Sequence, residues 1–355
     1  MDREIVKIFE KAYAREHITQ AECVKLLSLE DSSAEACAMR GLASAIVRER
    51  TDNTGSIFAQ IGLQCYPCKG NCDFCSFAEK YNMMGHIKMD DASIAAATKA
   101  FTDGDQLFGL WLMTMADYNL DEYLKMVQVV KENKIGSVNL YTNVGDTSYE
   151  AFQEIKAAGM DGVYHCWRLG EGKHTSFTSE QRKQTMMNAR KAGLDLLDAL
   201  EPIGIEHTPE EMAEHIFFSK ELETIQYGAM KRISVPGTLF ENTPEISYYT
   251  LSKYTAAVVL AMAGMKKFPW IGIHEPTIHG YMSGANLITA ETGVNPRDTV
   301  ADTLQHRGLD IADCRRILKD AGYKYGAHGD GSRFELQSTP PGSKRSWSTV
   351  RNSWN

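Results

Sequence analysis

Residues 57–75, IFAQIGLQCYPCKGNCDFC, decide the fold of this 355-residue chain, because they join a buried strand to a cysteine-rich loop. The segment 57–64 is a nearly continuous apolar run, which is typical of a strand buried on both faces in a parallel sheet. Cys68, Cys72 and Cys75 follow it in the pattern C-x3-C-x2-C. In a reducing compartment such a cluster indicates metal binding more than disulfides. We therefore predict a strand that runs directly into a metal-binding loop.

The spacing of the three cysteines suits an iron–sulfur cluster. Three soft thiolates on one tight loop can hold three irons of a [4Fe-4S] cube and leave the fourth iron without a protein ligand. Gly70 and Asn71 let the loop turn back, and Phe74 would offer a flat apolar surface beside the cluster. The alternative is a four-thiolate zinc site that adds Cys65. Its two C-x2-C pairs stand only three residues apart, whereas zinc knuckles are usually separated by roughly a dozen or more, so the spacing favours the cluster.

Downstream of this loop, short apolar runs alternate with segments of helical periodicity at intervals of roughly 25–50 residues, which is the rhythm of βα units. Several runs are continuously apolar, as in a parallel sheet covered on both faces. The predicted class is therefore α/β, a complete or nearly complete (β/α)8 barrel of the TIM type. We expect its strands at residues 57–64, 107–114, 137–141, 162–166, 194–200, 229–234, 270–274 and 285–288.

The predicted barrel spans residues 51–325 and is flanked by two different segments. Residues 1–50 have the pattern of two or three helices, which we expect to form an N-terminal helical cap. Residues 326–355 form a C-terminal extension that soon becomes rich in Ser, Pro, Gly and Arg. From about residue 338 we predict disorder, because this composition cannot bury enough apolar surface to order itself.

Charge and hydropathy exclude several classes of protein. The chain has 38 basic and 46 acidic residues and a net charge of −8, so it repels a phosphate backbone and no nucleic-acid partner is expected. The N-terminal stretch MDREIVKIFEKAYAREH lacks the apolar core of a signal peptide. No uncharged apolar run approaches the ~20 residues of a membrane span. We therefore expect a soluble, cytoplasmic protein with no membrane partner.

The cysteine loop, with Phe74 before its last cysteine, resembles that of the radical S-adenosylmethionine superfamily. In that superfamily the open iron binds the amino and carboxylate groups of S-adenosylmethionine, and reduction of the cluster gives methionine and a 5′-deoxyadenosyl radical. Over about residues 20–325 the chain is similar to the group that contains biotin synthase, methylornithine synthase and the hydrogenase-cofactor maturases. The segment LLSLED before the barrel carries part of this resemblance. EPIGIEHT (201–208) and ETGVNPRD (291–298) look most like the radical enzyme of the [Fe]-hydrogenase guanylylpyridinol cofactor pathway.

The resemblance also implies cofactor-binding residues at the carboxyl ends of three strands. Asp117 corresponds to an acid that binds the amino group of S-adenosylmethionine, although the glycines that accompany it in relatives are missing here. Glu171 and Arg182 correspond to a Glu and an Arg that bind its amino-acid part, and an arginine fork matches a carboxylate with two hydrogen bonds. Gly204 and Glu206 lie in a turn that contacts ribose and adenine in relatives. The alternative for Glu171 and Arg182 is a pair of solvated surface charges.

The function implied by the resemblance is an enzyme that abstracts hydrogen from a small-molecule intermediate of cofactor biosynthesis, with electrons from a donor such as flavodoxin or ferredoxin. A second possibility is sulfur insertion as in biotin or lipoyl synthase, which needs another cluster, yet only Cys166 lies on a barrel strand beyond the first. A third is a non-catalytic iron–sulfur carrier or sensor, although carriers usually give the cluster four cysteines.

His274, Glu275 and His279 could ligate a metal, but a hydrogen-bonded polar layer is favoured. The sequence points to no catalytic residue.

Overall fold

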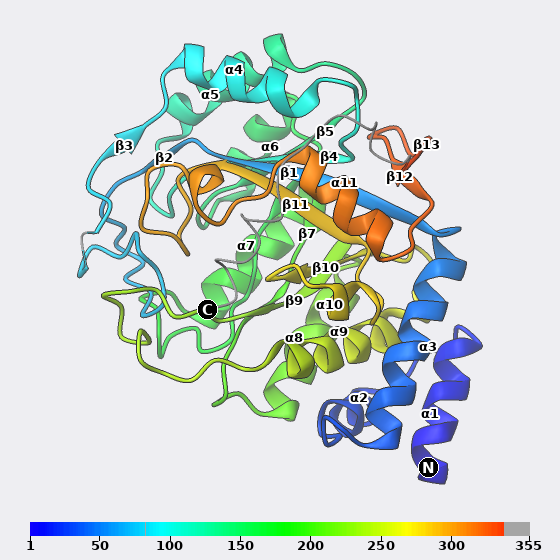
Figure 1. The fold of residues 1–355 in the computed structure, drawn as a ribbon. Coiled ribbons are helices and arrows are strands. Elements are labelled where there is room, and N and C mark those ends of the chain that lie inside the picture. Colours follow the sequence, from blue (N-terminus) through cyan, green and yellow to red (C-terminus); the bar gives the residue numbers. More distant parts are fainter. Residues whose placement is uncertain (82, 337–355) are drawn as a thin grey trace.

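A closed barrel of eight parallel strands forms the centre of the computed structural model, which describes residues 1–81 and 83–336 (Figure 1). Each strand pairs with its neighbour in chain order, and Ser56–Gly62 pairs with Leu287–Gly293 to close the ring. The predicted (β/α)8 class is therefore confirmed. The strands are β1 (Thr54–Gly62), β4 (Gly109–Met113), β5 (Asn139–Asn143), β6 (Gly162–Tyr164), β7 (Asp195–Leu197), β9 (Gln226–Lys231), β10 (Trp270–His274) and β11 (Leu287–Gly293).

The fifth predicted strand, 194–200, is interrupted in the structure. It divides into β7 and a short segment β8 (Leu200–Ile203), which pairs irregularly with β9. The break falls at Asp198, whose carboxylate accepts a hydrogen bond from the Ala199 amide at 2.7 Å and another from the Ser219 hydroxyl. A side chain that binds the adjacent backbone amide competes with ladder pairing, which explains the interruption.

Helices surround the barrel and their apolar stripes face it; the buried stripe of one of them consists of Tyr123, Met126, Val127 and Val130. The helix that begins at Ser179 has Thr178 as its N-cap, in a capping box with Gln181. The helices after the strands are α4 (Asp91–Thr102), α5 (Leu120–Asn133), α6 (Tyr149–Ala157), α7 (Ser179–Lys191), α8 (Pro209–Glu221), α9 (Tyr248–Met262), α10 (Ile278–Tyr281), the 3-10 turn η1 (Thr303–Gln305) and α11 (Ile311–Asp320).

The N-terminal helices α1 (Arg3–Tyr13), α2 (Gln20–Leu27) and α3 (Ala34–Arg50) form an outer layer on the α8 and α9 side of the barrel (Figure 1). Helix α9 is buried along most of its length, because the barrel covers one side and these helices cover the other. Lys253 of α9 forms an ion pair with Asp31 at 2.8 Å, which holds the two layers together.

The described part of the C-terminal extension adds to the barrel sheet. Strand β12 (Tyr325–Ala327) pairs with the first residues of β1, and β13 (Arg333–Glu335) pairs antiparallel with β12. The disorder predicted from about residue 338 concerns residues that lie outside the described part of the chain. In the part that is described, no helix is long and apolar enough to cross a membrane.

A two-stranded sheet of β2 (Gln64–Cys65) and β3 (Ile87–Lys88) follows β1. It fixes both ends of the segment between residues 66 and 86, which contains the three cysteines. The first barrel strand therefore delivers the cysteine loop to the carboxyl end of the barrel, where such folds place their chemistry.

The break at Asp198 leads to a testable prediction about stability. The carboxyl group is 2 % exposed, and burial raises its pKa to about 7, although hydrogen bonds from Ser219 and Cys166 oppose the shift. Because the folded protein holds this proton more tightly than the unfolded chain, the stabilisation is present at low pH and is lost as pH rises through 7. We expect Asp198→Asn to remove this dependence, which is worth about 2 kcal/mol between roughly pH 5.5 and 8.

Urea unfolding of the wild type and of Asp198→Asn at both pH values measures this difference. The variant should gain stability relative to the wild type at the higher pH, whatever its stability at the lower one. If the difference in unfolding free energy between the two proteins were the same at both pH values, Asp198 would be ionised in the folded state throughout this range.

Candidate active site

A cavity of about 230 Å³ opens at the carboxyl end of the barrel strands. Cys68, Cys72, Cys75 and Phe74 line it on one side, and side chains from the barrel strands and their loops line the rest. The structure therefore brings the three predicted metal ligands to the position at which the barrel fold places active sites.

Backbone amides point at the sulfur atoms of the cysteine loop. The Gly70 amide donates to Cys68 Sγ at 3.4 Å, and the Phe77 amide donates to Cys75 Sγ at 3.4 Å. Such hydrogen bonds stabilise thiolate charge and tune the potential of iron–sulfur clusters. The loop thus has the donor set that a cluster with three protein thiolates requires.

Burial holds the cysteines as neutral thiols until a metal replaces their protons. It raises the pKa of Cys72 to about 12, with partial opposition from the charge of Arg168, and it also raises the pKa values of Cys68 and Cys75. Binding of a metal therefore releases protons at neutral pH.

Cys65 stands apart from the other three cysteines. It lies in β2, where it pairs with Ile87, and it does not line the cavity. Among residues 1–81 and 83–336, no three His, Cys, Asp or Glu side chains are gathered around a point where a single metal ion could bind. A zinc site needs its ligands around one ion, whereas a cluster provides a separate iron for each thiolate. The separate position of Cys65 does not fit a site made by four thiolates, and the three cysteines of the cavity fit the donor set of a cluster.

A second loop, between β6 and α7, is bound to the cysteine loop. The Asp73 amide donates to the His174 carbonyl at 2.8 Å, and the two side chains meet at 2.9 Å between Asp73 Oδ2 and His174 Nδ1. The Ser176 amide donates to the Gly70 carbonyl at 2.8 Å. These contacts fix the β6–α7 loop beside the predicted metal ligands.

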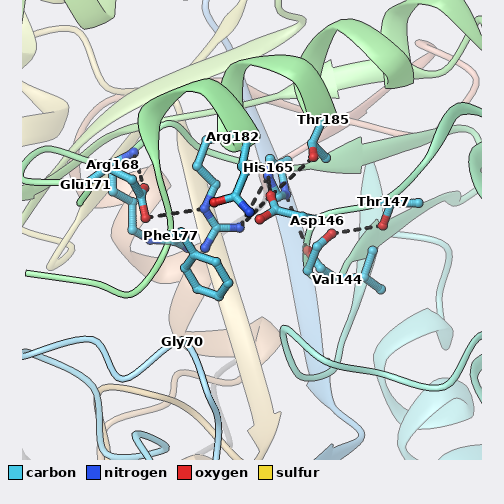
Figure 2. Close-up of polar contacts among 12 residues, drawn as sticks. Gly70, Val144, Asp146, Thr147, His165, Arg168, Glu171, Phe177, Arg182 and Thr185 are labelled. Atoms are coloured by element: carbon cyan, nitrogen blue, oxygen red, sulfur yellow. Dashed lines mark hydrogen bonds and ion pairs between the residues drawn. The ribbon is translucent and has the colours of Figure 1, made fainter.

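Arg182 extends from the first turns of α7 into the cavity wall (Figure 2). Its Nε lies 3.4 Å from Glu171 Oε1, its Nη1 lies 3.1 Å from Asp146 Oδ1, and its guanidinium stacks on Phe177 at 3.8 Å. The structure therefore joins Glu171 and Arg182, the two residues that the family resemblance assigns to the amino-acid part of S-adenosylmethionine. They are not the solvated charges of the alternative, because the Glu171 side chain has no exposed surface and that of Arg182 is 4 % exposed.

These contacts change the expected roles of both residues. Glu171 does not line the cavity; it lies behind Arg182 and accepts a hydrogen bond from Thr175 at 2.7 Å. Two of the three guanidinium nitrogens of Arg182 already have protein partners, and only Nη2 has none among the described residues. Arg182 therefore offers a ligand one nitrogen rather than the complete fork that the sequence predicts.

Arg168 is a site residue that the sequence analysis missed. It lines the cavity, its Nε lies 2.9 Å from Glu201 Oε1, and the Tyr164 hydroxyl donates to the other Glu201 oxygen at 2.9 Å. In the described chain its two terminal nitrogens make no hydrogen bond, so Arg168 presents the complete edge that binds a carboxylate. The sequence feature that could have indicated Arg168 is the run of polar residues after the fourth strand. The pairing of Arg168 with Glu201 could not be predicted, because Glu201 is distant in sequence.

Gly204 and Glu206 stand beside the cavity rather than in its lining. The Glu206 carboxylate receives both terminal nitrogens of Arg232, which itself lines the cavity and stacks on Phe240 at 3.9 Å. A Cβ at Gly204 would collide with both members of this ion pair. The glycine is thus required by the close approach of the pair, and Arg232 is the member that faces a ligand.

Asp117 lies at the rim, and its side chain is exposed. The structure does not bring it into the cavity; its backbone carbonyl accepts a hydrogen bond from the Tyr66 hydroxyl at 2.7 Å. The preceding residues Thr114, Met115 and Ala116 do line the cavity.

The wall that includes the end of β10 carries the predicted polar layer. Arg297 lies 3.0 Å from Glu275 and 3.5 Å from Glu291, and it contacts His274. Burial, together with the charge of Arg297, lowers the pKa of His274 to about 3, so the imidazole is neutral at pH 7. His279 is exposed on α10 and takes no part. The predicted polar layer thus includes His274 and Glu275 but not His279.

The fold and the site together are those of a parallel βα barrel with three cysteines on the loop after its first strand and with arginines around the same cavity. No family model matches the chain. The biotin synthase of Clostridium tetani is 27 % identical over 235 residues, which cover 62 % of this chain and 69 % of that protein. The biotin synthase of Carboxydothermus hydrogenoformans is 21 % identical over 333 residues, which cover 91 % of this chain and all of that protein.

Solved structures share the fold over most of their length. The FeFe-hydrogenase maturase HydG from Carboxydothermus hydrogenoformans has a TM-score of 0.75 at 14 % identity and covers 92 % of this chain and 79 % of its own. Methylornithine synthase (PylB) has a TM-score of 0.76 at 17 % identity and covers 91 % of this chain and 98 % of its own. The predicted resemblance to the group of biotin synthase and methylornithine synthase is therefore confirmed, and it supports the prediction that the chain is an enzyme. The closer resemblance to the guanylylpyridinol-pathway enzyme stays a prediction.

The contact between the two loops leads to a prediction about cluster binding. In Gly70→Ala the new methyl group would collide with the Phe177 ring, so one of the loops must move. We expect this variant to retain roughly half or less of its iron after anaerobic reconstitution, since distortion of supporting residues costs about tenfold or more in metal affinity.

Gly41→Ala is the matched control, because a Cβ at Gly41 meets nothing within 4 Å. Iron and sulfide per chain should equal the wild-type values in this control. Full iron occupancy in Gly70→Ala would show that the loop contact does not shape the cysteine site.

Proposed function

We propose that this chain binds a [4Fe-4S] cluster through Cys68, Cys72 and Cys75 and binds S-adenosylmethionine in the adjoining cavity. When bound, these groups supply a 5′-deoxyadenosyl radical that abstracts hydrogen from a small-molecule intermediate, in keeping with a role in cofactor biosynthesis. The observation that carries the proposal is that three cysteine sulfur atoms, two of which receive backbone amide donors, share one cavity with arginine nitrogens that have no partner among the described residues.

Different side chains of the cavity would bind different parts of S-adenosylmethionine. Arg168 offers a carboxylate two terminal nitrogens, and Arg182 adds one from the neighbouring α7. Phe74 contributes an apolar face on the cysteine side. Because both arginines lie beside the cysteine loop, an amino acid carboxylate held by them would lie next to the cluster.

The cavity also suits radical chemistry in its shape and polarity. Its apolar lining on the cysteine side includes Phe77, Met113 and Met115, all of which are buried. Such a lining excludes water from the reacting atoms. The polar layer around Arg297 gives a polar substrate hydrogen-bonding partners on another part of the wall.

Sulfur insertion is less well supported. Cys166 is fully buried and does not line the cavity, and in residues 1–81 and 83–336 the cavity-lining cysteines are the three of the loop. A sacrificial cluster would need ligands in the cavity that these cysteines do not provide.

The proposal includes a cytoplasmic location and an electron donor such as flavodoxin or ferredoxin. All eight cysteines are free thiols, which fits a reducing compartment. The proposed organisation is a helical segment at 1–50, the barrel at 51–325 and an extension at 326–355.

Deoxyadenosine formation tests the proposed chemistry. After anaerobic reconstitution, the wild type should form 5′-deoxyadenosine from S-adenosylmethionine when dithionite supplies the electrons. Cys72→Ala should form none. Chromatography measures the product. Cys37→Ala is the control, because Cys37 is exposed on α3 and far from the cavity, and it should match the wild type. Product from Cys72→Ala, or a cluster-loaded wild type that fails to bind S-adenosylmethionine, would contradict the proposal and favour a carrier or sensor.

A further inference from the structure

Asp146, in the loop between β5 and α6, receives three donors on a single carboxylate oxygen (Figure 2). Oδ1 lies 3.1 Å from Arg182 Nη1, 3.2 Å from Thr185 Oγ1 and 3.1 Å from His165 Nε2. The donors come from α7 and from the end of β6, so one carboxylate joins two elements of the barrel to its own loop. Neither Asp146 nor His165 has a role in the proposed binding of cluster or cofactor.

The protonation states follow from the contacts. A carboxylate can only accept, so His165 donates to Asp146 in the tautomer that carries the proton on Nε2; Nε2 also lies 3.4 Å from Arg182 Nη1, and Nδ1 lies 3.4 Å from the Val144 carbonyl. Burial lowers the pKa of His165 although Asp146 raises it, and the ring is neutral at pH 7. Asp146 is ionised there, because the His165 hydrogen bond and the charge of Arg182 outweigh burial and lower its pKa to about 2.

The arrangement leaves Arg182 little freedom. Its side chain is 4 % exposed, Glu171 holds Nε, Asp146 holds Nη1, and the Phe177 ring covers one face of the plane. A guanidinium fixed at two nitrogens and one face can present its third nitrogen in only one direction. Thr185 and His165 in turn fix Asp146, which would otherwise turn toward the outer surface, where 25 % of its side chain is exposed.

We propose that Asp146 is a positioning residue that aims Nη2 of Arg182 into the cavity, and that His165 and Thr185 act by orienting Asp146. The inference rests on the proposed function, in which Arg182 contacts the carboxylate of S-adenosylmethionine. Asp146 itself touches no ligand in this account; it acts only through Arg182.

The test compares the affinities of two ligands for the reconstituted enzyme. 5′-Methylthioadenosine shares the nucleoside of S-adenosylmethionine but lacks its amino acid part. The relevant ratio is the dissociation constant of 5′-methylthioadenosine divided by that of S-adenosylmethionine, and it reports on binding of the amino acid part, which includes the carboxylate. We expect Asp146→Asn to weaken the binding of S-adenosylmethionine about tenfold, which is the size of one charge-assisted hydrogen bond. The affinity for 5′-methylthioadenosine should stay unchanged. A general loss of structure would weaken both ligands.

Asp298→Asn is the matched control. Asp298 also accepts hydrogen bonds from a histidine and a threonine, His306 at 2.9 Å and Thr303 at 3.0 Å, but it does not contact Arg182. Its substitution should leave the ratio of dissociation constants at the wild-type value.

A double-mutant cycle separates the inference from the proposed function. If Asp146 acts through Arg182, then adding Asp146→Asn to Arg182→Gln changes the ratio no further. If Arg182→Gln alone leaves the ratio unchanged, the proposed role of Arg182 fails. If Arg182→Gln lowers the ratio but Asp146→Asn does not, or if the two losses simply add, the positioning role of Asp146 is overturned while the proposed function stands.

Discussion

The contact between the cysteine loop and the β6–α7 loop is the interaction on which the rest of the site depends. Asp73 and His174 bind each other through both backbone and side chains, and Gly70 leaves room for the Phe177 ring. The first loop carries the sulfur ligands, and the second leads into the helix that carries Arg182. The contact between the loops places the three cysteines against the arginines of the cavity, an arrangement that neither loop provides alone.

The charges around the cavity are tolerated because each cation is paired. Burial of an isolated charge costs several kcal/mol, and a partner at hydrogen-bonding distance offsets that cost. In four of the five pairs the carboxylate comes from another loop or strand than its cation, so these ion pairs also connect separate segments of the barrel; Glu245 lies in the connection that follows the strand of Lys231. The pairs are Arg168 with Glu201, Arg182 with Asp146, Lys231 with Glu245, Arg232 with Glu206 and Arg297 with Glu275.

The sequence was most informative where the signal is local. Apolar runs and helical periodicity located the barrel strands, and cysteine spacing located the predicted cluster ligands, because both depend on neighbouring residues. The break in the fifth strand was missed, since it depends on Ser219 and the backbone next to Asp198. The roles of Arg168 and Asp146 were missed for a similar reason: their partners Glu201 and Arg182 follow more than thirty residues later, and only the closed barrel brings them together.

The central claim is that three cysteines hold a four-iron cluster whose fourth iron faces the cavity. Mössbauer spectroscopy of the iron-57 reconstituted enzyme, with and without S-adenosylmethionine, tests it most directly. The account predicts a cubane spectrum in which the signal of one iron in four changes when S-adenosylmethionine is added. Four irons that all keep their signals, or iron that forms no cubane in a protein that binds zinc instead, would contradict it.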